Sequence, residues 1–150
     1  MTPEGTACRR MVTGSLKHYR LPHTEAAIRL ICMIGAHESG GFLYSQQVNG
    51  PALSFFQIEP VTFRDLCSYA RQKHLWIARQ LPCDPLRLVF DPRFAAAMSR
   101  VFFLRFPEPL PAENDLNGLA RYAKRYWNTR VGKACVEDYH QAWMKYFNEA

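Results

Sequence analysis

The sequence predicts a mainly α-helical fold, built as one domain over residues 1–150 with a buried central helix and at most a short β segment. Between residues 24 and 36 nearly every side chain is apolar or small, as in a helix that is buried on most sides. Elsewhere, apolar residues recur at helical spacing between residues that begin and end helices. A chain of 150 residues, 48% of them hydrophobic, is also long enough to bury such a core.

The first half of the chain is expected to contain two helices. A short helix at about residues 5–19 precedes the buried one. Thr24 is placed to cap the buried helix, and Glu25 lies in its first turn, where a carboxylate suits the positive end of the helix dipole. We expect the buried helix to reach Glu38 and to end at Gly40-Gly41, because paired glycines break helices.

The later elements are predicted from the same signals. A loop over 39–53 leads to a brief extended segment or turn over 54–60. Asp91-Pro92 is a strong helix start, because Asp caps a helix and Pro fits its first position. Asn114 or Asp115 is expected to cap another. The predicted helices are about 61–80, 92–106, 116–128 and 136–147, with a linker over 81–90.

The chain carries a moderate positive charge of +6, from 19 Lys and Arg against 13 Asp and Glu. The charges are spread along the sequence, so they fit a polyanionic partner without selecting one. No predicted helix has a clustered Arg and Lys face, which argues against a nucleic-acid-binding protein. No run of about 18 apolar residues is present, so we expect no membrane span.

The histidines and the five cysteines do not fall at metal-site spacings. His37-Glu38 begins like an H-E-x-x-H zinc motif, but Gly41 stands where the second histidine would be. We therefore expect no metal and no cofactor. Cys32 and Cys67 are expected to be buried thiols. The N-terminus lacks a secretory signal, so we expect synthesis in the cytoplasm and, for any role outside it, export by another route.

Glu38 is the candidate acid of this protein. It stands at the end of the most hydrophobic predicted helix, whereas glutamates usually lie on solvated faces. A half-buried carboxyl has a raised pKa and can transfer a proton near neutral pH. The alternative interpretation is a solvated charge at a helix end.

Three stretches follow one another in an informative order. They are Ala36-His37-Glu38-Ser39-Gly40-Gly41, Ala52-Leu53-Ser54-Phe55-Phe56-Gln57-Ile58-Glu59-Pro60 and Ala123-Lys124-Arg125-Tyr126-Trp127-Asn128-Thr129. In this order and spacing the chain resembles the lysozyme-like superfamily, specifically the soluble lytic transglycosylases and goose-type lysozymes. Those proteins have a Glu-Ser at the end of a buried helix, then a Gly-Leu-Met-Gln-Ile-x-Pro segment, and later a Tyr-Asn motif. The resemblance covers residues 24–147, and its last part is also similar to phage-encoded muramidase-like proteins.

The resemblance implies a lysozyme-like domain that cleaves the β-1,4 bond between MurNAc and GlcNAc in peptidoglycan glycan strands. Glu38 would be the single catalytic acid and base, as in lytic transglycosylases. Gln57 and Asn128 would hold the sugar, and Ser39 would hydrogen-bond the Glu38 carboxyl. Aromatic side chains near the motifs are either sugar platforms or part of the core. They are Tyr44, Phe55, Phe56, Tyr126 and Trp127. Of these, Tyr44, Phe56 and Tyr126 are the predicted substrate contacts, together with Ser39.

The chain departs from the family at two of the motifs. Ser54 replaces the Gly, and Phe55-Phe56 replaces Leu-Met, so a bulkier and more aromatic cleft wall is expected. Trp127 stands where Tyr would precede the Asn, which leaves the register of Asn128 open.

Other functions stay open at this point. Glu59 or Asp65 near the second motif could supply a second carboxylate, which would make the protein a hydrolytic lysozyme. A virion structural or wall-binding protein could keep the fold without catalysis, and a basic nucleic-acid-binding protein is the weakest alternative. The resemblance implies a phage source. The protein would then act on the cell wall from the periplasm, either as an endolysin or as part of a virion beside other virion proteins.

Overall fold

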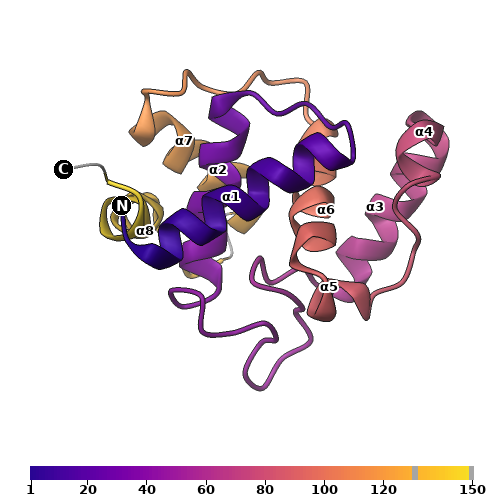
Figure 1. The fold of residues 1–150 in the computed structure, drawn as a ribbon, viewed down its shortest axis with the longest axis horizontal. Coiled ribbons are helices and arrows are strands. Elements are labelled where there is room, and N and C mark those ends of the chain that lie inside the picture. The colour runs from indigo at the N-terminus through magenta and orange to yellow at the C-terminus, as the bar shows by residue number, and fades with distance from the viewer. Residues whose placement is uncertain (130–131, 149–150) are drawn as a thin grey trace.

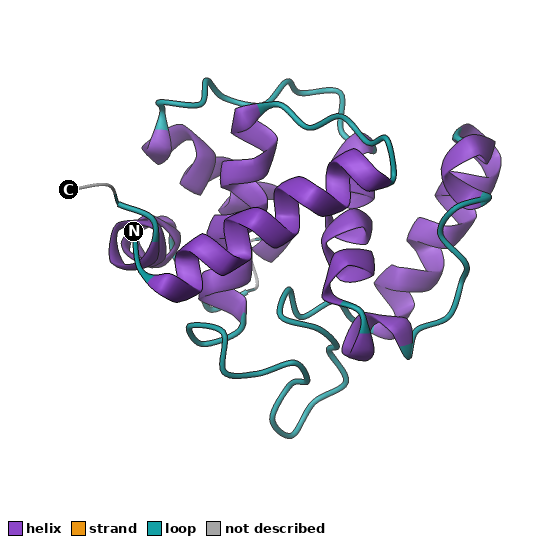
Figure 2. Cartoon of the chain, viewed as in Figure 1, coloured by secondary structure: helices purple, strands orange, loops and turns teal. Residues whose placement is uncertain are grey.

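Helices form the fold of this chain in a computed structural model that describes residues 1–129 and 132–148 (Figure 1). Their bounds are α1 Pro3–His18, α2 Glu25–Glu38, α3 Pro60–Lys73, α4 Leu75–Ala78, α5 Arg87–Phe90, α6 Pro92–Leu104, α7 Leu116–Tyr122, the π-helix η1 Ala123–Asn128, and α8 Val136–Tyr146. In the described ranges, β structure is limited to isolated bridges of Leu53 with Gln46 and with Ile58 (Figure 2). The mainly α prediction is confirmed. None of these helices is long and apolar enough to cross a membrane.

Helix α2 is the centre of the fold, and α1, α6, α7 and α8 pack around it (Figure 1). All of its residues from Leu30 to Ala36 are buried, as the apolar run predicted. The Thr24 hydroxyl accepts a hydrogen bond from the Ala27 amide at 3.3 Å and caps the helix as expected. The helix ends at Glu38, and the two glycines that follow Ser39 adopt positive φ angles. Burial of α2 on nearly all sides thus brings a carboxyl to the edge of the core.

Two expectations about helix bounds are wrong. The helix expected over 61–80 is broken at His74, whose backbone leaves the helical region with φ −142° and ψ 69°. The Tyr69 hydroxyl contacts the His74 ring at 3.1 Å and donates to the Leu104 carbonyl at 3.0 Å, so contacts with α6 accompany the break. The linker expected over 81–90 contains the short helix α5.

Two predicted helix starts are confirmed. The Asp91 carboxylate accepts a hydrogen bond from the Phe94 amide at 3.0 Å and caps α6. The Asp115 carboxylate accepts from the Gly118 amide at 2.8 Å and caps α7. Capping of this kind depends on a few neighbouring residues, which is why sequence alone locates it.

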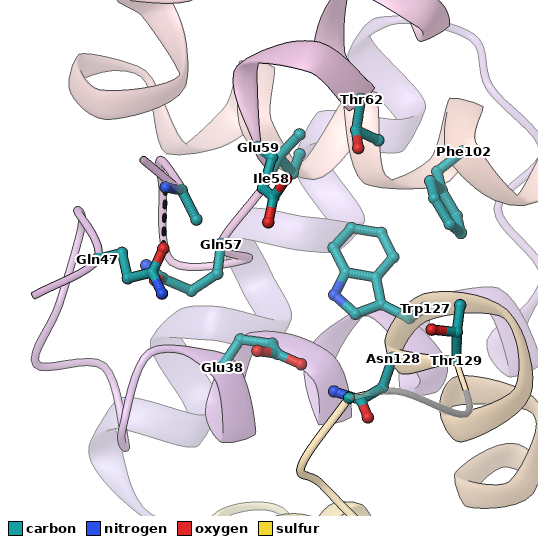
Figure 3. A pocket seen from close by; sticks show the side chains of 12 residues that line it. Glu38, Gln47, Gln57, Ile58, Glu59, Thr62, Phe102, Trp127, Asn128 and Thr129 are labelled. Atoms are coloured by element: carbon teal, nitrogen blue, oxygen red, sulfur yellow. Dashed lines mark hydrogen bonds between the residues drawn. The ribbon is translucent and has the colours of Figure 1, made fainter. Parts of the chain in front are cut away.

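The loop between α2 and α3 turns through residues with left-handed backbone conformations. Ser54 has φ 72° and Gln57 has φ 55°, in a region that residues with a Cβ rarely occupy. Ser54 stands where the resembled family has Gly, a residue that would adopt this φ without strain. The Ser54 hydroxyl accepts a hydrogen bond from the Phe56 amide at 3.1 Å, which offsets part of the strain. The turn places Gln57 in the wall of the same cleft as Glu38 (Figure 3).

The start of α1 lies beside the end of α8, and backbone hydrogen bonds join the residues there (Figure 1). The Met1 amino group donates to the Asn148 carbonyl at 2.8 Å, and the Thr2 amide donates to the Tyr146 carbonyl at 3.0 Å. A Cβ on Gly5 would lie 2.1 Å from the carbonyl oxygen of Tyr146. The close approach of α1 to the end of α8 therefore requires glycine at residue 5.

Candidate active site

A cleft of about 640 Å³ opens beside the C-terminal end of α2 (Figure 3). Its walls come from α2, the loop before α3, the first turn of α3, α6, and η1 with the residues after it. Each of the three sequence motifs contributes to it: Glu38 from the first, Gln57 and Glu59 from the second, Trp127 and Asn128 from the third. A space of this size holds part of an oligomer or a whole small molecule.

Glu38 is half-buried in the cleft wall. The Tyr139 hydroxyl donates a hydrogen bond of 2.7 Å to its Oε1 atom, and no Lys or Arg of the described ranges forms an ion pair with it. Burial raises the pKa of the Glu38 carboxyl, because desolvation disfavours the charged form; the Tyr139 hydrogen bond and the nearby charge of His37 oppose the rise. Glu38 can therefore hold a proton nearer to neutral pH than an exposed glutamate can.

Tyr139 is the site residue that sequence reasoning missed as a functional group. It lies in α8, and the structure gives its side chain no exposure. Burial and the adjacent Glu38 raise the pKa of Tyr139, so the hydroxyl stays protonated and acts as a donor. A buried tyrosine needs a partner for its hydroxyl, and that requirement was the available signal. The partner lies 101 positions away in the chain, which periodicity cannot reveal.

Gln57 and Asn128 both line the cleft, and their role in holding a sugar stays a prediction. The Gln57 amide donates to the Ser54 carbonyl at 2.8 Å, which leaves its oxygen available to a ligand. Asn128 ends the π-helix η1, and its amide nitrogen points towards the Glu38 carboxylate (Figure 3). π-helical turns often occur at functional sites. The register of the third motif therefore brings Asn128 to the candidate acid.

Trp127 is the aromatic side chain of the third motif that faces the cleft. Its ring stacks on Phe103, with 5.7 Å between the ring centroids and 26° between the ring planes. The centroid of the Phe102 ring lies 4.7 Å from that of Trp127. Held from behind in this way, an indole presents a rigid apolar surface to the cleft. Trp127 is thus the best placed of the aromatic side chains considered as sugar platforms.

Two predicted substrate contacts are wrong, because the side chains are fully buried. The Ser39 hydroxyl does not bond the Glu38 carboxyl; it donates to the Gly35 carbonyl and accepts from the Phe42 amide, both at 2.6 Å. Its role is to end α2. Phe56 packs against Gly35 inside the core, where a Cβ on the glycine would lie 2.9 Å from the ring. Phe55-Phe56 therefore does not form an aromatic cleft wall.

Two further aromatic residues also lie outside the cleft lining. Tyr44 is 47% exposed on the loop after α2. Tyr126 stacks on Phe106 with 4.3 Å between ring centroids, and its hydroxyl donates to Glu108. Because residues 126 and 127 point in different directions from η1, only the second of them reaches the cleft.

Of the two carboxylates near the second motif, only Glu59 lines the cleft. Glu59 occupies the N-cap position of α3, yet its side chain makes no capping hydrogen bond. Asp65 is exposed on α3 outside the cleft lining. A second carboxyl group is therefore present in the same cleft as Glu38.

Comparison of the chain with protein-family models, with curated proteins and with solved structures gives no match. The kinship with the lysozyme-like superfamily therefore stays a prediction that rests on the three motifs. Within residues 1–129 and 132–148, no three His, Cys, Asp or Glu side chains gather closely enough to hold a metal ion. The expectation that no metal or cofactor is needed likewise stays a prediction.

Proposed function

We propose that this protein is a peptidoglycan-cleaving muramidase of the lytic transglycosylase type, with Glu38 as its acid and base. The observation that carries the proposal is a half-buried carboxyl with a raised pKa in the wall of a cleft that amide and indole side chains also line. Proton transfer to a glycosidic oxygen requires such a carboxyl in its neutral form.

In the first step, neutral Glu38 donates its proton to the glycosidic oxygen between MurNAc C1 and GlcNAc O4. The C1–O4 bond breaks, positive charge develops on the MurNAc ring, and Glu38 is left ionised. The Tyr139 hydroxyl, 2.7 Å from Oε1, stabilises the carboxylate at this point. Gln57 and Asn128 hold the sugar hydroxyls, and the Trp127 ring supports the apolar face of a sugar ring.

In the second step, the same Glu38 acts as a base. It removes the proton from the 6-hydroxyl of MurNAc while that oxygen closes on C1. The product is a 1,6-anhydro sugar, no water is consumed, and Glu38 returns to its neutral form. One carboxyl group therefore suffices for this route.

The proposed partners are peptidoglycan glycan strands and, if the protein is carried in a particle, other virion proteins. The positive charge of +6 favours an anionic wall at modest salt. We place the action in the periplasm at the cell wall, after synthesis in the cytoplasm. A phage source belongs to the same proposal and rests on the motif resemblance.

A hydrolytic lysozyme is the second candidate, and the position of Glu59 favours it. An inverting glycosidase needs a second carboxylate that activates water on the opposite face of the sugar. Glu59 lines the same cleft as Glu38 and is not used as a helix cap. The two routes give different products, a reducing end for hydrolysis and an anhydro end for transglycosylation. Their masses differ by one water.

The deciding experiment digests purified sacculi with wild type, Glu38→Gln and Glu59→Gln, and measures the masses of the released muropeptides. Anhydro products from wild type and Glu59→Gln, with none from Glu38→Gln, are the expected result. Reducing-end products that disappear with Glu59→Gln would replace the transglycosylase by the hydrolase. Binding to sacculi without any soluble product would leave a wall-binding or virion structural protein, and full activity of Glu38→Gln would refute the mechanism.

A further inference from the structure

Lys124 holds one end of the Asn128 side chain. Its ammonium group donates to the Asn128 Oδ1 atom at 2.7 Å and to the Gly132 carbonyl at 2.9 Å. Lys124 and Asn128 lie at the two ends of one turn of η1, and both side chains are partly buried. Partial burial makes a charge-assisted hydrogen bond stronger than the same bond in water.

This bond fixes which way the Asn128 amide faces. An ammonium group has donors and no acceptor, so only the amide oxygen can face Lys124. The amide nitrogen must then point the other way, and Figure 3 shows it directed towards the Glu38 carboxylate. Asn128 also acts on Tyr139, where it opposes the rise in the pKa of the hydroxyl. Lys124 therefore decides whether Asn128 offers the site two donors or an acceptor.

Two hydrogen bonds have defined directions near the acid. The Lys124 ammonium donates to Asn128 Oδ1, and the Tyr139 hydroxyl donates to Glu38 Oε1. The Asn128 amide nitrogen is directed towards the same carboxylate (Figure 3). A donor that faces a carboxylate favours its ionised form.

The geometry points to Lys124 as a positioning residue that orients the Asn128 amide so that its donor nitrogen faces the Glu38 carboxyl. It touches neither the substrate nor the reacting atoms. Its part in catalysis rests on the proposed function, whereas its effect on the Glu38 carboxyl does not.

Gly132 supports this assignment independently. A Cβ at this position would lie 2.1 Å from Asn128 Oδ1 and 2.3 Å from the Asn128 carbonyl oxygen. The Asn128 side-chain oxygen thus lies between the backbone of Gly132 and the Lys124 ammonium group. Any side chain at residue 132 would displace Asn128 without removing a charge.

The test titrates the Glu38 side-chain carboxyl by ¹³C NMR in wild type, Lys124→Met, Lys124→Arg, Gly132→Ala and Lys133→Met. Lys133 is exposed and lies close in sequence, so its variant removes the same charge and leaves the Lys124–Asn128 hydrogen bond intact. Lys124→Met and Gly132→Ala are expected to raise the pKa of Glu38, because the Asn128 amide nitrogen is no longer held facing the carboxylate. Lys124→Arg should restore part of the wild-type value, and Lys133→Met should leave it unchanged.

Wall lysis is measured on the same samples, after far-UV circular dichroism shows that each is folded. Lys124→Met is expected to lower kcat by up to about 100-fold with little change in KM, since misplaced groups slow the chemical step. Equal effects of Lys124→Met and Lys133→Met on the Glu38 titration would overturn the inference. If Lys124→Met failed to fold, Gly132→Ala would decide in its place. If wild type lysed no wall but the titration still moved as expected, the proposed function would fail and the positioning role would stand.

Discussion

Removal of the Tyr139 hydroxyl should lower the free energy of unfolding by an amount that depends on pH. Tyr139→Phe keeps a buried ring and deletes the 2.7 Å hydrogen bond to Glu38. A hydrogen bond to a charged group contributes about 1.5–3 kcal/mol, and one between neutral groups about 0.5–1.5 kcal/mol. The free energy of unfolding should therefore fall by about 1.5–3 kcal/mol where Glu38 is ionised, and by about half as much where it is protonated.

The sign follows from the direction of the Glu38 pKa shift. Burial raises the pKa of folded Glu38 above its unfolded value, so the folded state binds more protons in the interval between the two values. Stability therefore declines as pH rises through that interval. Tyr139→Phe removes a bond that favours the ionised form, which raises the folded pKa further and extends the decline to higher pH.

Urea denaturation at about pH 4 and about pH 8 measures this difference, since the linear extrapolation gives the free energy of unfolding at each pH. The same substitution is then made in a Glu38→Gln background, where no carboxyl titrates at this position. The larger cost at the higher pH should disappear there. An equal cost of Tyr139→Phe at both pH values in the Glu38-containing protein would refute the reasoning.

Three further substitutions test the fold by the same denaturation measurement. Gly41→Ala should cost about 1–3 kcal/mol, because residue 41 has φ 80° and a Cβ there would lie 2.1 Å from the Tyr146 hydroxyl. Gly14→Ala, its control in α1 with nothing within 4 Å of an added Cβ, should stabilise by about 0.5–1 kcal/mol; destabilisation would contradict the packing described. Asp115→Ala should cost about 1 kcal/mol by removing the cap on the Gly118 amide, and an unchanged midpoint would count against that cap.

The parts of the fold that the sequence predicts depend on neighbouring residues. Thr24 and Asp91 cap their helices, and the apolar run before Glu38 forms the buried α2, because each signal acts within one or two turns. The break at His74 could not be predicted in this way. It is accompanied by a hydrogen bond from Tyr69 to a carbonyl of α6, and tertiary contacts of this kind override local propensity.

The same distinction between local signals and tertiary packing applies to the residues of the candidate site. Glu38 was found from its place at the end of an apolar helix, and Gln57 and Asn128 from the motif resemblance; all three line one cleft. Residue type alone could not say which aromatic ring faces that cleft, and Phe56 turned inward while Trp127 did not. The direction of such a side chain depends on packing between elements distant in sequence.

The pairing of the chain ends has a consequence for protein engineering. Because α1 starts where α8 stops, with Thr2 and Tyr146 joined through their backbones, a linker of a few residues could close the chain into a circle. New termini could then be opened in an exposed loop, such as the one around Gln47 or the one around Cys83. For the same reason the whole domain could be inserted into a surface loop of a host protein, entering and leaving at one point without pushing the host's strands or helices apart.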